Sequence, residues 1–422
     1  MDAMTWADAL IAASSTADSK RLASDAPPGA GAALFQRLAV AVGASPTEAL
    51  AVARKARFLP PVDRPWQLRA RAVEHRLTGN WSASAKAFLA AGEACSDPTQ
   101  GLIFSIGAID SLARAGKQRS ATSLGQRIAK GLRQAGEHGQ AGRALLNVGN
   151  ALLWGDRHRE AEPIYQQALE ALDGTDFRAE FAAAKVGLST AAIFVRSPRE
   201  CLRLAEEAEA DLEALGLTAY AVQARINRGH ALLRMGQPDR AILVFAAIRE
   251  EVPPDSFDFA RVGQYLGDAY LWLELETEAE AAYRSAVDAP GIRQIHLSAA
   301  NCRLGLAEVA LRREQSERAR ALFREARRDY KAHGNESFVL MAELGVLKAK
   351  VALGESPTAK TFQTLLSGLE RKKLWQPLAE TLILWARVAP LDQAIALARR
   401  ASRLIQSRGM LNLAWMPSAV LA

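Results

Sequence analysis

The chain has few of the residues that form disulfides, bind metals or act as nucleophiles. Its 422 residues include three cysteines and six histidines. The cysteines are odd in number and far apart, which argues against a disulfide framework and for a reducing compartment; they are Cys95, Cys201 and Cys302. No histidine lies at metal-ligand spacing from another histidine or a cysteine, so we expect no metal site.

Long apolar runs are also missing. No window approaches eighteen uncharged apolar residues, so we expect no membrane-spanning segment. The first eight residues carry Asp2 and Asp8, where a secretory signal would need positive charge. We therefore predict a cytoplasmic protein that does not bind membranes.

Motifs for nucleotide and nucleophile chemistry are absent from the sequence. It has no Gly-x-x-x-x-Gly-Lys-Ser/Thr loop, and no Gly-x-Gly-x-x-Gly follows a strand-like run. Cys201 occupies a small-residue position in a helical segment, which indicates a buried structural thiol. We predict that the chain is not an enzyme and needs no cofactor.

Helix-forming Ala, Leu, Arg and Glu are abundant instead, and one pattern occurs four times. A small residue is followed by three small or apolar residues 12, 16 and 19 positions later. The copies are Gly149/Ala161/Tyr165/Ala168, Gly229/Ala241/Phe245/Ile248, Gly267/Ala279/Tyr283/Ala286 and Ala307/Ala319/Phe323/Ala326. Their spacing, with one weaker copy between the first two, predicts an all-α array of helix hairpins with a period near 40 residues.

The residue sizes in this pattern have a packing reason. Small residues such as Gly267 are expected where the two helices of a hairpin cross most closely. Aromatic residues such as Tyr283 are expected to fill the wider space toward the next hairpin. Proline and glycine punctuation then predicts three parts. These are an N-terminal helical extension or cap over 1–63, regular hairpins over 64–334, and degenerate repeats with a C-terminal cap over 335–422.

Two family resemblances follow from these segments. Residues 145–152 and 265–270, each with its downstream Ala, Tyr and Ala, resemble a tetratricopeptide repeat (TPR). The repeats with their helical N-terminal extension are also similar to the TPR regions of bacterial CHAT-domain proteins, which join TPRs to a caspase-like peptidase. The first resemblance implies a right-handed α-solenoid whose concave face is lined by the first helix of each hairpin. The second implies a regulatory or sensor subunit of a CHAT-like protease.

Two rows of residues are predicted to face that concave surface. The first follows each small position and contains Asn150, Thr190, His230, Asp268 and Glu308. The second lies about one helical turn further on and contains Trp154, Phe194, Arg234, Trp272 and Arg312. Trp and Arg dominate binding hot spots, so the rows predict a groove for a peptide or partner protein. The alternative is that the two tryptophans plug gaps between adjacent hairpins.

Charge is unevenly distributed along the chain. The formal net charge is +7, and residues 290–422 alone contain 21 Lys and Arg against 11 Asp and Glu. Such an excess allows contact with nucleic acid or an acidic surface. The simpler interpretation is a set of solvated helix faces with interleaved Glu. The leading prediction is therefore a non-enzymatic scaffold, with a CHAT-type regulator and a nucleic-acid adaptor as alternatives.

Overall fold

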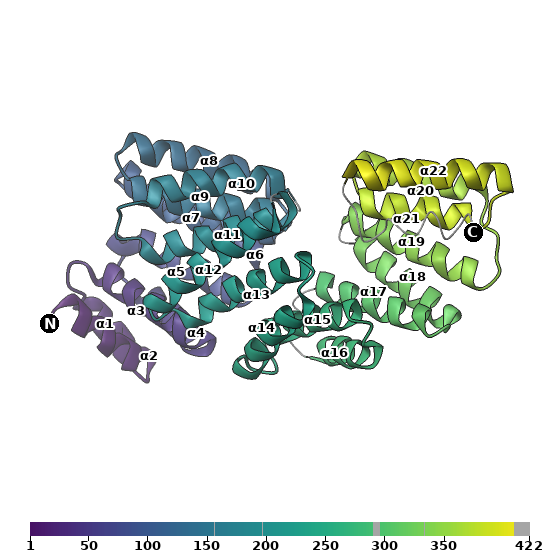
Figure 1. The fold of residues 1–422 in the computed structure, drawn as a ribbon. Coiled ribbons are helices and arrows are strands. Elements are labelled where there is room, and N and C mark those ends of the chain that lie inside the picture. Colours follow the sequence, from purple (N-terminus) through teal and green to yellow (C-terminus); the bar gives the residue numbers. More distant parts are fainter. Residues whose placement is uncertain (156, 196, 290–295, 333, 409–422) are drawn as a thin grey trace. The chain divides into compact units, whose positions relative to one another are not determined.

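The computed structural model describes residues 1–155, 157–195, 197–289, 296–332 and 334–408. Within these ranges every regular element is helical, with 22 α-helices and two short 3-10 helices (Figure 1). The prediction of an all-α array of TPR-like hairpins is confirmed. The chain divides into two compact units, residues 1–227 and 228–422, and each is described by itself.

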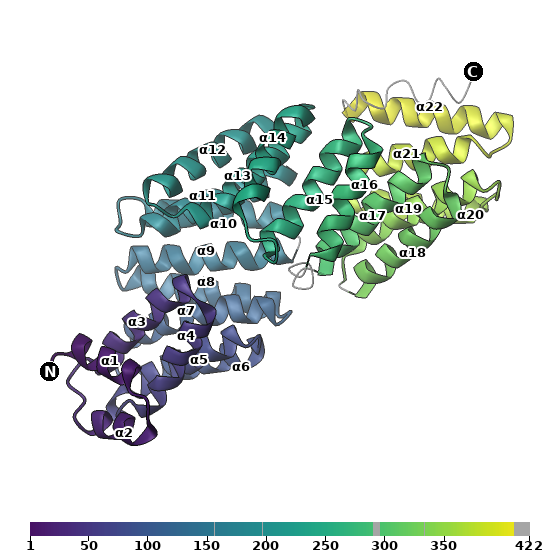
Figure 2. The ribbon, with the colours of Figure 1, turned by 90° about the horizontal axis from the view of Figure 1, so that it is seen from below.

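The first unit begins with short helices and continues with hairpins. The short elements are α1 (Ala3–Ala12), α2 (Thr16–Ser24), α3 (Ala30–Ala44), α4 (Pro46–Lys55), η1 (Ala56–Phe58) and η2 (Pro61–Asp63). The hairpins are α5 (Arg64–Leu77) with α6 (Trp81–Glu93), α7 (Pro98–Arg114) with α8 (Gln118–Gln134), α9 (His138–Trp154) with α10 (His158–Leu172), and α11 (Arg178–Val195) with α12 (Pro198–Ala214). Helices α7 to α10 pack side by side in chain order (Figure 2).

The second unit continues the same alternation. Helix α13 (Thr218–Arg234) contains the division between the units. The remaining helices are α14 (Pro238–Glu251), α15 (Phe257–Trp272), α16 (Glu276–Asp288), α17 (His296–Arg312), α18 (Ser316–Ala332), α19 (Glu336–Ala352), α20 (Ala359–Lys372), α21 (Trp375–Ala386) and α22 (Leu391–Arg408).

The predicted period is confirmed by where the first helices of the hairpins begin. Helices α7, α9, α11 and α13 begin at residues 98, 138, 178 and 218, and α15, α17 and α19 begin at 257, 296 and 336. The interval is thus 39 or 40 residues throughout. Glycines in the left-handed region close several hairpins, as at Gly116 with φ of 78° and Gly236 with φ of 71°. Such a backbone is strained for residues that carry a Cβ.

Each aromatic residue of the pattern packs against glycine on two helices. In the first unit, a Cβ added to Gly149 would lie 2.6 Å from the Tyr165 ring, and one added to Gly187 would lie 2.2 Å from it. Gly267 and Gly305 enclose Tyr283 in the second unit in the same way, at 2.5 and 2.2 Å. Tyr165 and Tyr283 therefore contact their own hairpin as well as the next one, which extends our packing prediction.

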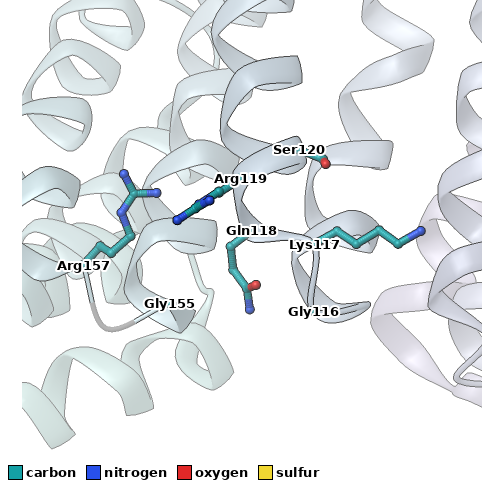
Figure 3. Close-up of a pocket in the computed structure, with 7 residues that line it drawn as sticks. All are labelled: Gly116, Lys117, Gln118, Arg119, Ser120, Gly155 and Arg157. Carbon is teal, nitrogen blue, oxygen red and sulfur yellow. The ribbon is translucent and has the colours of Figure 1, made fainter. Parts of the chain in front are cut away.

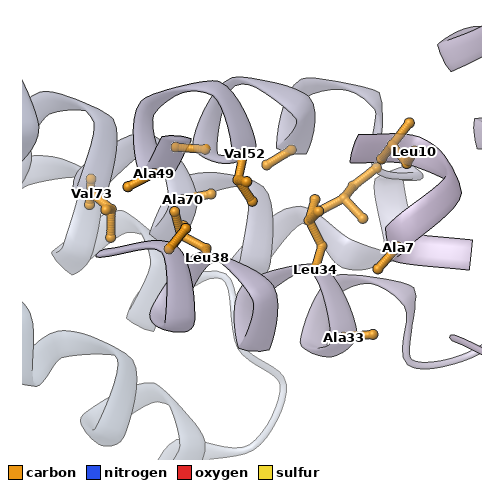
Figure 4. Close-up of a cluster of buried hydrophobic side chains, with 14 of the residues drawn as sticks. Ala7, Leu10, Ala33, Leu34, Leu38, Ala49, Val52, Ala70 and Val73 are labelled. Atoms are coloured by element: carbon orange, nitrogen blue, oxygen red, sulfur yellow. The ribbon is translucent and has the colours of Figure 1, made fainter. Parts of the chain in front are cut away.

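The N-terminal helices share a hydrophobic core with the first hairpins. The cluster runs from Trp6 on α1 to Ala108 on α7, and Figure 4 shows its central part. The buried Trp6 indole donates a hydrogen bond to the Leu22 carbonyl oxygen at 2.8 Å, so α2 is held against α1. The boundaries at residues 63 and 334 stay predictions. No helix in the described ranges has the length and apolar composition to cross a bilayer.

Candidate functional site

In the first unit, the predicted row residue Trp154 lies in a stack of alternating aromatic and cationic side chains. Trp154 ends α9 and is 44% exposed. The Arg114 guanidinium carbon, at the end of α7, lies 4.2 Å from the Trp154 ring centroid and 4.9 Å from the Trp81 ring centroid. We call Trp81, Arg114 and Trp154 the indole ladder. Cation–π contact fixes the orientation of these rings at a cost far below that of burial.

Exposure bears on the two explanations for the tryptophans. A residue that plugs a gap between hairpins is expected to be buried, yet Trp154 is 44% and Trp272 is 54% exposed. Exposed indoles are uncommon on a protein surface because their burial is favourable. Both side chains are therefore available to another molecule. The assignment of the rows to a binding groove stays a prediction.

The polar residues of the first-unit row are engaged by neighbouring side chains. The Tyr165 hydroxyl donates a hydrogen bond to Asn150 Oδ1 at 2.6 Å, and the Nδ2 group of Asn150 has no partner among the described residues. Thr190 Oγ1 accepts a 2.8 Å hydrogen bond from the buried Asn227 Nδ2. Asn150 thus keeps a donor for a ligand carbonyl, whereas Thr190 serves the core. The side chain of Phe194 lies outside the described residues.

In the second unit, His230 is held as a neutral ring. It packs edge-on against Tyr265 with centroids 4.1 Å apart. Burial, followed by the charges of Arg261 and Arg234, lowers the pKa of His230 to about 4. His230 therefore presents no charge at neutral pH. Arg234, the next row residue on α13, is exposed.

Asp268 is the polar row residue of α15. The Tyr283 hydroxyl donates a hydrogen bond to its Oδ1 at 2.7 Å. Burial raises the pKa of Asp268 to about 6, although the hydrogen bonds from Tyr283 and Gln264 act in the opposite direction. This carboxyl group can therefore change protonation state near neutral pH.

Glu308 and Arg312 both lie on α17, but they differ in availability. Lys348 Nζ lies 3.6 Å from Glu308 Oε1 and 2.8 Å from Glu380 Oε2. Burial alone would lower the pKa of Lys348, but these two carboxylates raise it. Glu308 is therefore neutralised within its own unit. Arg312 is exposed, and its Nη1 donates a weak 3.4 Å hydrogen bond to the Leu271 carbonyl.

A shallow basic pocket lies beside the indole ladder, where the α7–α8 and α9–α10 turns approach each other. Its volume is about 560 Å³. In Figure 3 the Arg119 and Arg157 side chains extend toward each other and Lys117 extends away. Arg157 is held by Glu160, with its Nε 2.7 Å from Oε1. Gly155, which follows Trp154, is part of the lining. The pocket places positive charge at one end of the ladder.

The cysteines and potential metal ligands do not form a reactive site among the described residues. Cys201 is fully buried, and its thiol points at the Ser189 carbonyl oxygen at 3.4 Å, which confirms the structural thiol. Burial raises the pKa of Cys302 and of the half-buried Cys95. In these ranges no group of three His, Cys, Asp or Glu side chains is arranged to hold a metal ion.

Two features of this site were missed from the sequence. Arg114 lies 40 residues before Trp154, so the period could have placed it in the same row. Gly187 and Gly305 lie two residues before their small positions and enclose the tyrosines from the next hairpin. The glycine spacing was visible, but its partner ring belongs to the preceding repeat.

Comparisons with known proteins show a fold and no family. No protein-family model matches the chain, and no curated protein matches it. A Rap protein complexed with competence and sporulation factor is similar in structure with a TM-score of 0.62 and 11% identity, over 82% of this chain and 99% of that chain. The Rap conjugation gene regulator of a plasmid, in complex with the Phr* peptide, has a TM-score of 0.56 and 13% identity, over 83% and 98%.

A third similar structure is the apo form of the quorum sensor NprR from B. thuringiensis. Its TM-score is 0.56 at 12% identity, over 80% of this chain and 97% of that chain. At these identities the likeness concerns the helical repeat fold alone. It agrees with the TPR resemblance of the sequence.

Proposed function

We propose that this chain is a non-enzymatic regulatory scaffold that holds an extended peptide, or a peptide-like segment of a partner protein. The observation that carries the proposal is the half-exposed Trp154, held in orientation by Arg114 in the row expected to line the concave face. Preorganised indole and guanidinium groups are the side chains that most often dominate a binding interface. Two of the similar structures are complexes with a signalling factor or a peptide, which supports this class of ligand.

The residues around Trp154 suit a peptide. The Asn150 side chain offers an amide donor, and its acceptor is already held by Tyr165, so the amide orientation is defined. A peptide carbonyl accepts from such a donor, while an apolar side chain packs on the exposed indole face. Trp272 and Arg312 offer a comparable pair of exposed groups in the second unit.

The test is a displayed library of random peptides selected against the purified full chain. We expect enriched peptides, and we expect Trp154→Ala to weaken their binding by about tenfold or more, because a buried hot-spot aromatic contributes at least about 2 kcal/mol. Tyr220→Ala is the matched control, since Tyr220 is 64% exposed but lies outside both rows. Equal loss in both variants, or no loss for Trp154→Ala, would contradict the proposal.

The finer alternatives have less support. A regulatory role beside a CHAT-like protease depends on the sequence resemblance alone, and none of the three similar structures is described as a CHAT-domain protein. Nucleic acid is not the expected partner, because several arginines of residues 290–422 are already paired with carboxylates, Arg313 with Glu280 and Arg303 with Asp329 among them. A cytoplasmic location in a bacterium stays part of this proposal.

A further inference from the structure

A cation enclosed by aromatic rings lies in the first unit, apart from the indole ladder. The Arg69 guanidinium carbon on α5 is 4.0 Å from the ring centroid of Phe35, 4.5 Å from that of Phe104 and 5.5 Å from that of Trp66. The rings come from α3, α5 and α7 and contact one another, with Trp66 and Phe104 centroids 4.5 Å apart. We call this arrangement the Arg69 cage.

No carboxylate of the protein neutralises this cation. Among the described residues Arg69 has no ion pair, and its buried Nε–H has no hydrogen-bond acceptor. The nearby Cys95 thiol is neutral at pH 7, because burial raises its pKa. Burial, followed by the charge of Arg143, lowers the pKa of Arg69 to about 10, so the guanidinium still carries its charge.

An unpaired buried charge is costly, and cation–π contact offsets only part of that cost. Other arginines of this unit show the usual solution. Arg143 lies 3.0 Å from the Glu180 carboxylate, and Arg37 lies 2.6 Å from the Asp8 carboxylate. Arg69 differs in having ring faces but no anion. It also keeps part of its surface exposed, so a ligand can reach it.

We propose that the Arg69 cage is a binding site for a carboxylate group. A guanidinium presents two parallel N–H donors that match the two oxygens of a carboxylate, and the aromatic walls exclude water from that pair. Arg143, which acts electrostatically on Arg69, adds a second positive charge. The assignment of this carboxylate to the bound peptide, as an acidic side chain or the C-terminus, rests on the function proposed above.

The cage itself is tested with sodium succinate as the probe, at an ionic strength held constant with sodium chloride. The readout is the ¹⁵Nε–¹Hε NMR signal of Arg69, identified by its loss in Arg69→Lys. We expect a saturable shift with succinate and none with the neutral diamide succinamide. Inorganic phosphate is titrated in parallel, and a shift with phosphate but not succinate would overturn the carboxylate assignment. So would the absence of any shift.

Variants separate this site from a purely structural role. Arg69→Met should abolish the rise in melting temperature that succinate produces, while Arg71→Met, an exposed arginine on the same helix, should keep it. Arg69→Lys keeps the charge without the planar pair of donors and should bind about tenfold more weakly. If Arg69→Met does not fold, Arg69→Lys decides: unchanged succinate affinity in that variant would overturn the proposal.

The two proposals fail separately. Succinate binding at Arg69 without peptide enrichment would remove the peptide function and leave the carboxylate site. Peptide enrichment that depends on Trp154, with no succinate effect at Arg69, would leave the function and remove the site. Peptides that lose about tenfold in affinity both on amidation of their carboxylates and in Arg69→Met would support both.

Discussion

At the scale of single residues, one polar contact occurs in both units with different chemistry. A tyrosine hydroxyl donates to the row residue of its own hairpin, Tyr165 to Asn150 and Tyr283 to Asp268. The acceptor is a neutral amide in the first unit and an ionisable carboxyl in the second. Because the geometry is alike, only the second hairpin should respond to pH.

We predict that Asp268→Asn makes the second hairpin insensitive to pH. The carboxyl pKa is about 6 in the folded protein and near 4 in an unfolded chain. Below about pH 4 the group is protonated in both states and costs nothing. As the pH rises through 6, the folded state has to ionise a buried group and loses stability. The unfolding free energy of Asp268→Asn relative to the native chain should therefore rise by about 2 kcal/mol from pH 4 to 7.

Urea unfolding followed by circular dichroism at several pH values measures this difference. Asn150→Asp is the reverse variant, and it should introduce a loss of stability on raising the pH where none existed. A constant offset between Asp268→Asn and the native chain at every pH would mean that the Asp268 carboxyl does not titrate in this range.

At the scale of elements, the contact between aromatic and glycine residues determines how closely consecutive hairpins approach. The Tyr165 ring lies between Gly149 on α9 and Gly187 on α11. The first glycine belongs to the same hairpin and was expected from the repeat pattern. The second belongs to the following hairpin, so it transmits the spacing from one repeat to the next.

We predict that Gly187→Ala destabilises the first unit by about 1–3 kcal/mol, because the new methyl group would lie 2.2 Å from the Tyr165 ring in a packed core. Gly155→Ala is the control, since its Cβ would meet nothing closer than 3.5 Å. Thermal unfolding compares the two variants. Adding Tyr165→Leu to Gly187→Ala should recover part of the loss, and no recovery would mean that the ring is not the source of the clash.

At the scale of the whole molecule, charge counted along the sequence differs from charge in space. The excess of cations in residues 290–422 suggested a basic surface. In the second unit, however, Arg313 and Arg318 reach back to Glu280 on α16, outside that range. Glu280 also lies 2.6 Å from Arg284, so one carboxylate, 14% exposed, serves three guanidinium groups.

We predict that Glu280→Gln destabilises the second unit by about 1–2 kcal/mol, because it leaves three cations without their shared partner. The arginines lower the Glu280 pKa against the effect of burial, so the carboxylate is ionised at neutral pH. The loss should shrink between 0.05 and 1 M salt, as screening weakens the repulsion, by rough Debye-length reasoning. Glu317→Gln is the control, since Glu317 is 67% exposed and pairs with Arg320 alone. Equal losses in the two variants would contradict the network.

The amino-acid sequence by itself determined the helices, the hairpin period and the small-residue positions. These depend on residues 3 to 19 positions apart, whose side chains meet within one hairpin whatever the rest of the chain does. It could not determine which row residues are free. Lys348 reaches Glu308 from the next hairpin, Arg114 covers Trp154 across a repeat, and the Arg69 cage joins three helices. Such contacts depend on how repeats pack on one another, and only the tertiary structure decided them.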